Sequence, residues 1–151
     1  MSSARIRIGI SSCLLGQEVR FDGGHKHNGY ITESLGQFFE FVPFCPEVAI
    51  GLGIPRPPIR LVRHGQAIEA RGVKDPALDV TDKLTAYAGK VAAKLDAVSG
   101  YILKKNSPSC GMERVKVYTA KGMPVTTAAG IYAGALMEQL PELPFEEEGR
   151  L

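Results

Sequence analysis

Three short apolar runs are each followed closely by a cysteine, and this pattern constrains the fold of the 151-residue chain more than any other feature. The runs occupy residues 6–11, 39–44 and 101–104. The cysteines that follow them are Cys13, Cys45 and Cys110. Runs rich in apolar and β-branched residues are typical of strands buried on both faces of a parallel sheet. Since parallel strands end at one edge of a sheet, the three thiols are predicted to lie at the same edge.

Segments with helical periodicity separate these runs. Apolar residues recur at helical spacing over the segments 30–39, 79–98 and 126–140. The runs 59–63 and 66–70 are typical of a β-hairpin, residues 115–119 predict a fourth strand, and the tail 146–151 is expected to fray. This alternation predicts an α/β fold, a three-layer sandwich with a mostly parallel, Rossmann-like sheet and the small β-hairpin at its edge.

Composition limits the size and the partners of this fold. With 44% apolar residues, the chain can bury one core, so residues 1–151 are expected to form a single domain. A formal net charge of +2, with both signs spread evenly, argues against nucleic acid as a partner. No apolar stretch approaches the length that spans a membrane, and no signal sequence precedes the first strand, so a cytoplasmic protein is expected. The oligomeric state stays open between monomer and homodimer.

The three cysteines allow several interpretations. Free cysteine is often a buried packing residue, but cysteines in loops punctuated by Pro46, Pro108 and Gly111 can be aimed at a ligand. Structural zinc prefers four ligands and paired C-x-x-C spacing; His25 and His27 could complete such a site, although histidines in a glycine-rich loop are more often solvated. Three thiolates could also hold a [4Fe-4S] cluster and leave one iron open.

Other polar residues near the cysteines have both a plain and a functional interpretation. Glu47, in the sequence CPE, is either an exposed glutamate or an acid–base group at the same edge. Ser107 and Ser109 either form the turn NSPSC or bind a ligand, and Asp22 in RFDGG is equally ambiguous. The stretch GLGIPR lacks the third glycine of a dinucleotide fingerprint, and the chain has no P-loop, so no nucleotide cofactor is indicated.

Several of these motifs occur together in one known family. The stretches SSCLLG, RFDGG, FCPEVAIGLGIPRPPIRL and KKNSPSCG follow one another within residues 8–111. In this order they resemble a small bacterial family of domains whose characterised members are thiouracil desulfidases. The last 40 residues resemble that family less distinctively, and they are not expected to include the additional C-terminal domain of some relatives.

The resemblance implies a site and a reaction. It implies that Cys13, Cys45 and Cys110 bind a [4Fe-4S] cluster with one open iron, and that Glu47 and a serine of NSPSC, here assigned as Ser107, are catalytic. Ser109 would orient the site, and with Asp22 it is a candidate substrate-binding residue. The implied reaction is non-redox: 2-thiouracil and water give uracil and hydrogen sulfide.

Two other functions remain open at this point. One is an iron–sulfur carrier or transferase that moves sulfur to or from a thiolated nucleobase or tRNA. The weak positive charge of the chain and the missing nucleotide-binding loop argue against this function. The other is a non-catalytic iron–sulfur or zinc module, in which Glu47 would have no catalytic role.

Overall fold

The first of two sheets in the computed structural model is entirely parallel. The structure describes residues 6–15, 28–54 and 56–148. The strands of this first sheet lie in the order β2-β1-β5-β8. Their bounds are β1 Ile6–Ser11, β2 Phe39–Phe44, β5 Gly100–Leu103 and β8 Phe145–Glu147. The carboxyl ends of all four strands therefore lie at one edge of the sheet, which confirms the predicted mostly parallel α/β arrangement.

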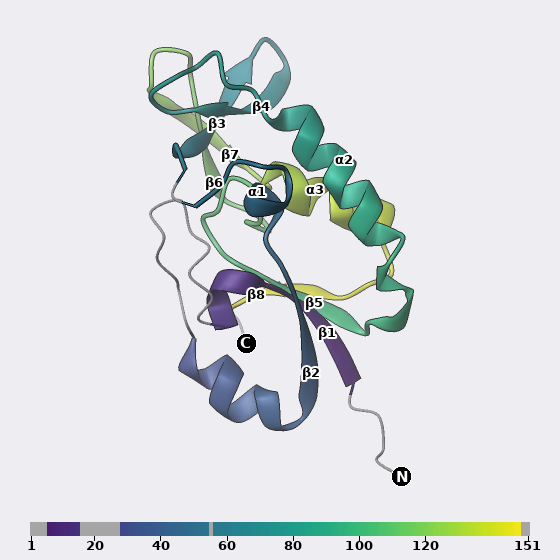
Figure 1. Cartoon of the computed structure of the whole chain (residues 1–151). Helices are drawn as coiled ribbons and strands as arrows, with labels where there is room; N and C mark the ends of the chain where they lie inside the picture. Colours follow the sequence, from purple (N-terminus) through teal and green to yellow (C-terminus); the bar gives the residue numbers. More distant parts are fainter. Residues whose placement is uncertain (1–5, 16–27, 55, 149–151) are drawn as a thin grey trace.

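A second sheet of mixed direction lies beside the first (Figure 1). Its strands lie in the order β4-β3-β6-β7. Their bounds are β3 Ile59–His64, β4 Ala67–Gly72, β6 Val115–Tyr118 and β7 Pro124–Ala128. The predicted hairpin is therefore present as β3 and β4, but it lies at an edge of this second sheet and not of the first. The predicted fourth strand, β6, also belongs to the second sheet.

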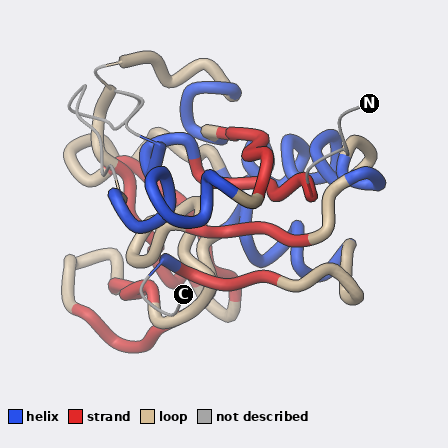
Figure 2. Tube along the Cα trace, turned by 90° about the horizontal axis from the view of Figure 1, so that it is seen from below, coloured by secondary structure: helices blue, strands red, loops and turns tan. Residues whose placement is uncertain are grey.

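Helical segments cover both faces of the first sheet (Figures 1 and 2). One face packs against η2, Tyr30–Ser34, and η3, Leu35–Gln37, through an apolar cluster that contains Ile10, Ile31 and Ile102. The other face packs against α2, Thr81–Ala92, and α3, Ile131–Gln139, through a larger core. The larger core continues into the second sheet, so the two sheets share one apolar interior.

Tyr101 explains why this interior needs a glycine in β1. Its ring packs between Phe44 and Phe145, and its hydroxyl lies 2.8 Å from the hydroxyl of Tyr132 in α3. A Cβ atom on Gly9 would lie 2.5 Å from the Tyr101 ring, closer than carbon atoms approach. Residue 9 must therefore be glycine for the sheet to keep this large aromatic side chain beneath α3.

All three predicted helical segments had the wrong bounds. The segment 30–39 forms a π turn and a 3₁₀ turn, and Phe38, expected on the apolar face, is 67% exposed. The segment 79–98 is helical only from Thr81 to Ala92, followed by η4, Leu95–Ala97. The segment 126–140 begins as strand β7, and Gly130 separates that strand from α3.

The end of the described chain also differs from the prediction. Residues 145–147, partly within the tail that was expected to fray, form β8 and pair in parallel with β5. Glu147 is buried at 8% exposure, and its carboxylate accepts a hydrogen bond from the Met112 amide, which compensates for its burial. Tertiary contacts therefore order an acidic segment that has no strand pattern of its own.

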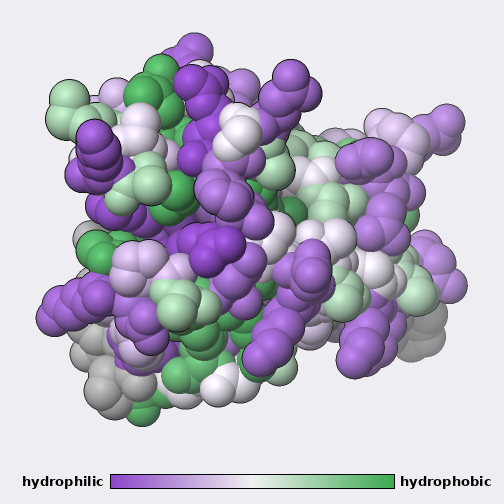
Figure 3. All heavy atoms as spheres, turned by 90° about the horizontal axis from the view of Figure 1, so that it is seen from above, coloured by the Kyte–Doolittle hydropathy of each residue, from purple (hydrophilic) through white to green (hydrophobic). Residues whose placement is uncertain are grey.

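The remaining elements are short and follow the carboxyl ends of β1 and β2. They are η1, Ser12–Leu15, and α1, Pro46–Ala49. Among the described residues, no helix is both long and apolar enough to cross a membrane. On the face seen in Figure 3, polar side chains predominate and apolar side chains lie between them.

Candidate active site

A pocket of about 600 Å³ opens at the carboxyl ends of the parallel strands. Each strand of the first sheet contributes to its wall: Cys13 follows β1, Cys45 follows β2, Lys104 follows β5 and Glu148 follows β8. Cys110 completes the set of thiols from the loop between β5 and β6. All three thiols thus line one pocket, as parallel strands predict.

Burial makes the thiols of Cys110 and Cys45 difficult to ionise when no cation is bound. The pKa of Cys110 is raised well above its usual value, first because the thiol is buried and also because Cys45, Glu47 and Cys13 place negative charge nearby. Burial likewise raises the pKa of Cys45, whereas the amide of Val48 and the charge of Arg56 act in the opposite direction. The mutual effects on Cys110 show that the three thiols lie close enough to interact.

The arrangement suits a group larger than one ion. Within residues 6–15, 28–54 and 56–148, no three Cys, His, Asp or Glu side chains are placed to share a single metal ion. The thiols instead surround a pocket whose volume far exceeds that of one cation. Soft thiolate ligands spread around such a space fit a multinuclear iron–sulfur group better than one tetrahedral zinc ion.

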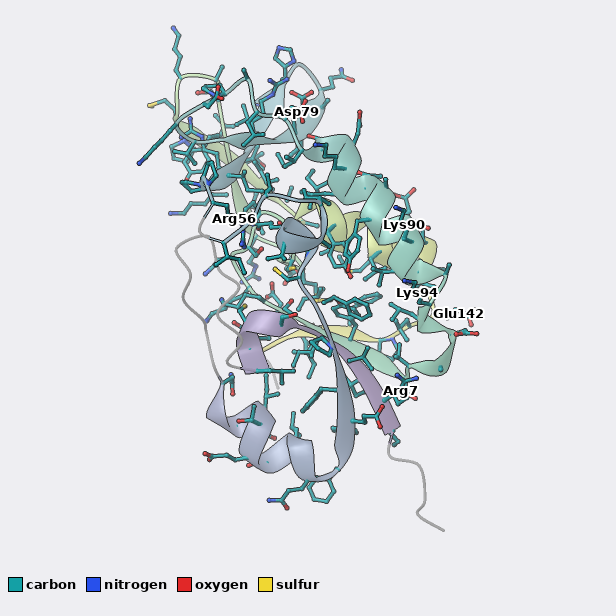
Figure 4. All side chains as sticks on the ribbon, viewed as in Figure 1. Arg7, Arg56, Asp79, Lys90, Lys94 and Glu142 are labelled. Atoms are coloured by element: carbon teal, nitrogen blue, oxygen red, sulfur yellow. The ribbon has the colours of Figure 1, made fainter. Side chains whose placement is uncertain are left out.

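Glu47 is fixed next to the thiols by two donors. It stands in α1, two residues after Cys45, and lines the same pocket. The Arg56 Nε atom donates to Oε1 of Glu47 at 3.0 Å, and the Ser109 hydroxyl donates to Oε2 at 2.5 Å. Arg56 lies beside α1 (Figure 4) and is itself held by the carbonyl of Gly53. Each carboxylate oxygen keeps a further lone pair for a ligand, so Glu47 can still accept a proton.

The two serines of NSPSC have different surroundings. Ser109 is fully buried and donates to Glu47. Ser107 is half-buried, lines the pocket, and its Oγ atom accepts hydrogen bonds from the amides of Ser109 and Cys110 at 3.2 and 3.0 Å. An oxygen that accepts two amide bonds keeps its own O–H to donate, so Ser107 can offer a proton to a ligand in the pocket.

The start of α3 holds the cysteine loop in place. The amides of Ile131 and Ala133 donate to the carbonyls of Pro108 and Ser109, and the amide of Gly130 donates to Gly111. These bonds satisfy amides that a helix start leaves without partners. The loop and α3 therefore form one hydrogen-bonded unit.

This close approach predicts that Gly130→Ala destabilises the protein. A Cβ atom at residue 130 would lie 2.5 Å from the Ser109 carbonyl oxygen, so backbone must move at a cost of about 1–3 kcal/mol or more. A denaturant titration measures the change. Gly134→Ala is the matched control, because its Cβ atom would make an ordinary 3.5 Å contact and alanine favours the helix interior. Equal stability of Gly130→Ala and the wild type would contradict the packing described.

Some sequence-based predictions of site residues cannot be placed, and some site residues were not predicted. Asp22, His25 and His27 lie outside the described residues. Ser11 was not predicted as a site residue, but its Oγ atom accepts from the Lys104 amide at 3.1 Å and it hydrogen-bonds the Cys110 thiol. The pocket ion pair of Lys104 and Glu148, whose Nζ and Oε2 atoms are 2.9 Å apart, was not predicted either. No local sequence pattern marks these residues, because their hydrogen-bond and ion-pair partners come from other parts of the chain.

A second hollow of about 400 Å³ adjoins the pocket and shares wall residues with it, among them Asn106 and Pro108. Among the described residues, its wall carries Arg60, Arg114 and Lys116 and no acidic residue. The Arg60 side chain lies over the Tyr118 ring, and its Nε atom is buried without a hydrogen-bond partner within the described part of the chain. This hollow is therefore positively charged.

Two buried thiols, one half-buried thiol and a firmly held carboxylate line one pocket of this α/β fold, so the protein is of the class that carries a cysteine ligand site. The chain belongs to the 2-thiouracil desulfurase family, whose model matches residues 8–148. It is 33% identical over 136 residues to the uncharacterized protein YbbK of Bacillus subtilis (strain 168), covering 86% of this chain and 88% of that one. A solved structure of TudS, a [4Fe-4S]-dependent thiouracil desulfidase, matches with a TM-score of 0.71 and 29% identity, covering 97% of this chain and 93% of that one.

Proposed function

We propose that the protein is a [4Fe-4S]-dependent desulfidase that converts 2-thiouracil and water to uracil and hydrogen sulfide. The observation that carries this proposal is the meeting of all three thiols with Glu47 in one pocket. Membership in the 2-thiouracil desulfurase family and the likeness to TudS support it. The substrate is a small thiolated pyrimidine.

Cys13, Cys45 and Cys110 would hold the cluster. The residues fit this group, because they are soft donors that surround a partly desolvated pocket too large for a single ion. Binding requires the thiols to lose their protons, so burial makes cluster assembly release protons at neutral pH. When bound, such a cluster supplies an iron that lacks a protein thiolate and acts as a Lewis acid toward the thione sulfur.

The side chains of the pocket supply the proton chemistry. Glu47 takes a proton from the water that attacks the thiocarbonyl carbon, and Arg56 and Ser109 keep its carboxylate oriented. Ser107 donates its hydroxyl proton to the pyrimidine ring as a hydrogen bond and holds it in the pocket. As the C–S bond breaks, Glu47 returns its proton to the sulfur, the added hydroxyl loses its proton to become the carbonyl of uracil, and the sulfur leaves with both protons as hydrogen sulfide, with no change in oxidation state.

A direct assay tests the proposal. Protein reconstituted anaerobically with iron and sulfide is expected to release uracil and hydrogen sulfide in equal amounts from 2-thiouracil. Sulfur that moves to an acceptor without free hydrogen sulfide would instead identify a sulfur transferase. A brown protein that binds thiouracil and forms no uracil would be a non-catalytic module.

The separate surroundings of the two serines predict different defects. Ser109→Ala removes a hydrogen bond to a charged carboxylate, worth about 1.5–3 kcal/mol, so turnover falls roughly ten- to hundredfold with KM nearly unchanged. Ser107→Ala removes a pocket hydroxyl, so KM for thiouracil rises. Steady-state kinetics per cluster distinguishes the two defects. Ser12→Ala, also in the pocket wall, is the control, and identical defects in the Ser107 and Ser109 variants would contradict these roles.

The basic hollow favours a second candidate substrate. A thiolated pyrimidine nucleotide carries a phosphate, which the charges of Arg60, Arg114 and Lys116 would attract while the ring occupies the adjoining pocket. If so, the thionucleotide has the lower KM of the two substrates, and Lys116→Ala raises that KM without affecting thiouracil. Equal KM values for the base and the nucleotide would leave the free base as the substrate.

A further inference from the structure

The loop that carries Ser107 and Cys110 is fastened at both ends by the carboxylates that end the described chain. At its start, Glu148 accepts a hydrogen bond from the Lys105 amide at 2.8 Å through Oε1 and pairs with the Lys104 ammonium through Oε2. At its end, Glu147 accepts from the Met112 amide at 2.9 Å. Glu147, the last residue of β8, and Glu148, which follows it, therefore hold residues 104–112 from both sides.

These carboxylates are costly to bury, and the loop compensates for the cost. Glu147 is 8% exposed, and the side chain of Glu148 is 9% exposed. A buried carboxylate is tolerated only when charged or N–H donors satisfy it, and here the donors are the two ends of the loop and Lys104. The ammonium of Lys104 also donates to the Lys105 carbonyl, which closes the start of the loop.

Left-handed backbone conformations flank the serine and the cysteine of this loop. Asn106, within the loop, has a φ of +66°, and Arg114, two residues beyond it, has a φ of +59°, a region that non-glycine residues seldom adopt. Between them lie the pocket serine and the most deeply buried thiol. Without the carboxylates of Glu147 and Glu148, the loop could relax by moving Ser107 and Cys110.

We propose that Glu147 and Glu148 are positioning residues that set the loop 104–112 in place for the site. The inference rests on the proposed function for what Cys110 and Ser107 do there, but the fastening itself depends only on the contacts above. It gives the end of the described chain a role in the chemistry that acts through the loop.

Hydrogen exchange of the full-length chain, followed by mass spectrometry before and after iron reconstitution, tests the proposal. In Glu147→Ala and in Glu148→Ala, exchange over 104–112 is expected to be about tenfold faster or more, since each loses a hydrogen bond to a charged acceptor. Exchange over α2 should not change. In the reconstituted protein, an iron chelator should remove the visible absorbance several-fold faster.

Control and conservative variants show whether faster exchange comes from the loss of these two carboxylates. Glu142→Ala is the control, because Glu142 is exposed near Lys94, on the other side of the molecule from Arg56 (Figure 4). Glu147→Gln and Glu148→Gln keep one oxygen acceptor and should recover much of the loop protection, which also covers the case in which an alanine variant does not fold. Loop exchange equal to that of the control, or faster exchange spread evenly over the protein, would overturn the proposal. Absence of desulfuration in the wild type would overturn the proposed function but not this result.

Discussion

Replacing Cys110 with serine is expected to remove the brown colour and the iron from anaerobically prepared protein. The wild type should contain about four irons per chain if it holds a cubane cluster. The hydroxyl of serine is a hard donor that stays protonated at neutral pH, so it cannot replace a thiolate. Cys13→Ser and Cys45→Ser should behave alike, since all three thiols line one pocket. Iron analysis and the visible spectrum provide the measurement.

The control for the cysteine variants is Met112→Leu, which removes a neighbouring sulfur and preserves volume. It should keep both iron and activity. A colourless wild type that takes up stoichiometric zinc under the same conditions would refute the cluster. So would a cysteine variant that keeps a full complement of iron.

Glu47→Gln is expected to keep the cluster and lose turnover by roughly a hundredfold or more, the usual effect of removing a general acid–base group. Glutamine preserves the shape of the side chain and leaves an oxygen for Arg56. Glu47→Ala is a less informative variant, because it would leave a guanidinium that is only 4% exposed without its partner and destabilise the fold. Hydrogen sulfide release per cluster under anaerobic conditions is the appropriate measurement.

The exposed Glu33→Gln is the control for the Glu47 variant and should be fully active. Near wild-type release by Glu47→Gln would remove Glu47 from the mechanism. A Glu47→Gln protein without iron would instead make this residue part of the support for the cluster.

The sequence predicts most reliably what is encoded locally. The strands at 6–11 and 39–44 have these bounds in the structure, because short runs rich in apolar residues and bounded by turns have few alternatives. A cysteine comes soon after each predicted strand, Cys110 a turn beyond the third, and the parallel direction of the strands was then enough to bring the three thiols together.

The rest depends on contacts between distant residues. The strand β7 is exposed along most of its length and has no apolar alternation, so the neighbouring alanine-rich segment suggested a helix. The division into two sheets depends on whether β6 pairs with β3 or with β5, which no local pattern specifies. The distinction between Ser107 and Ser109 rests on a hydrogen bond that spans 62 residues.

The order of strands in the first sheet has a consequence for how the protein folds. In the middle of this sheet, β1 pairs with β5. These two strands are far apart in the chain, because the β3–β4 hairpin of the second sheet and α2 come between them. Closing so long a loop is entropically costly, and folds dominated by distant contacts form slowly. Until β5 arrives, the inner edge of β1 stays open to pairing with other chains, so the nascent protein is prone to aggregation at this stage. Rapid dilution from denaturant should therefore give lower yields as the protein concentration rises.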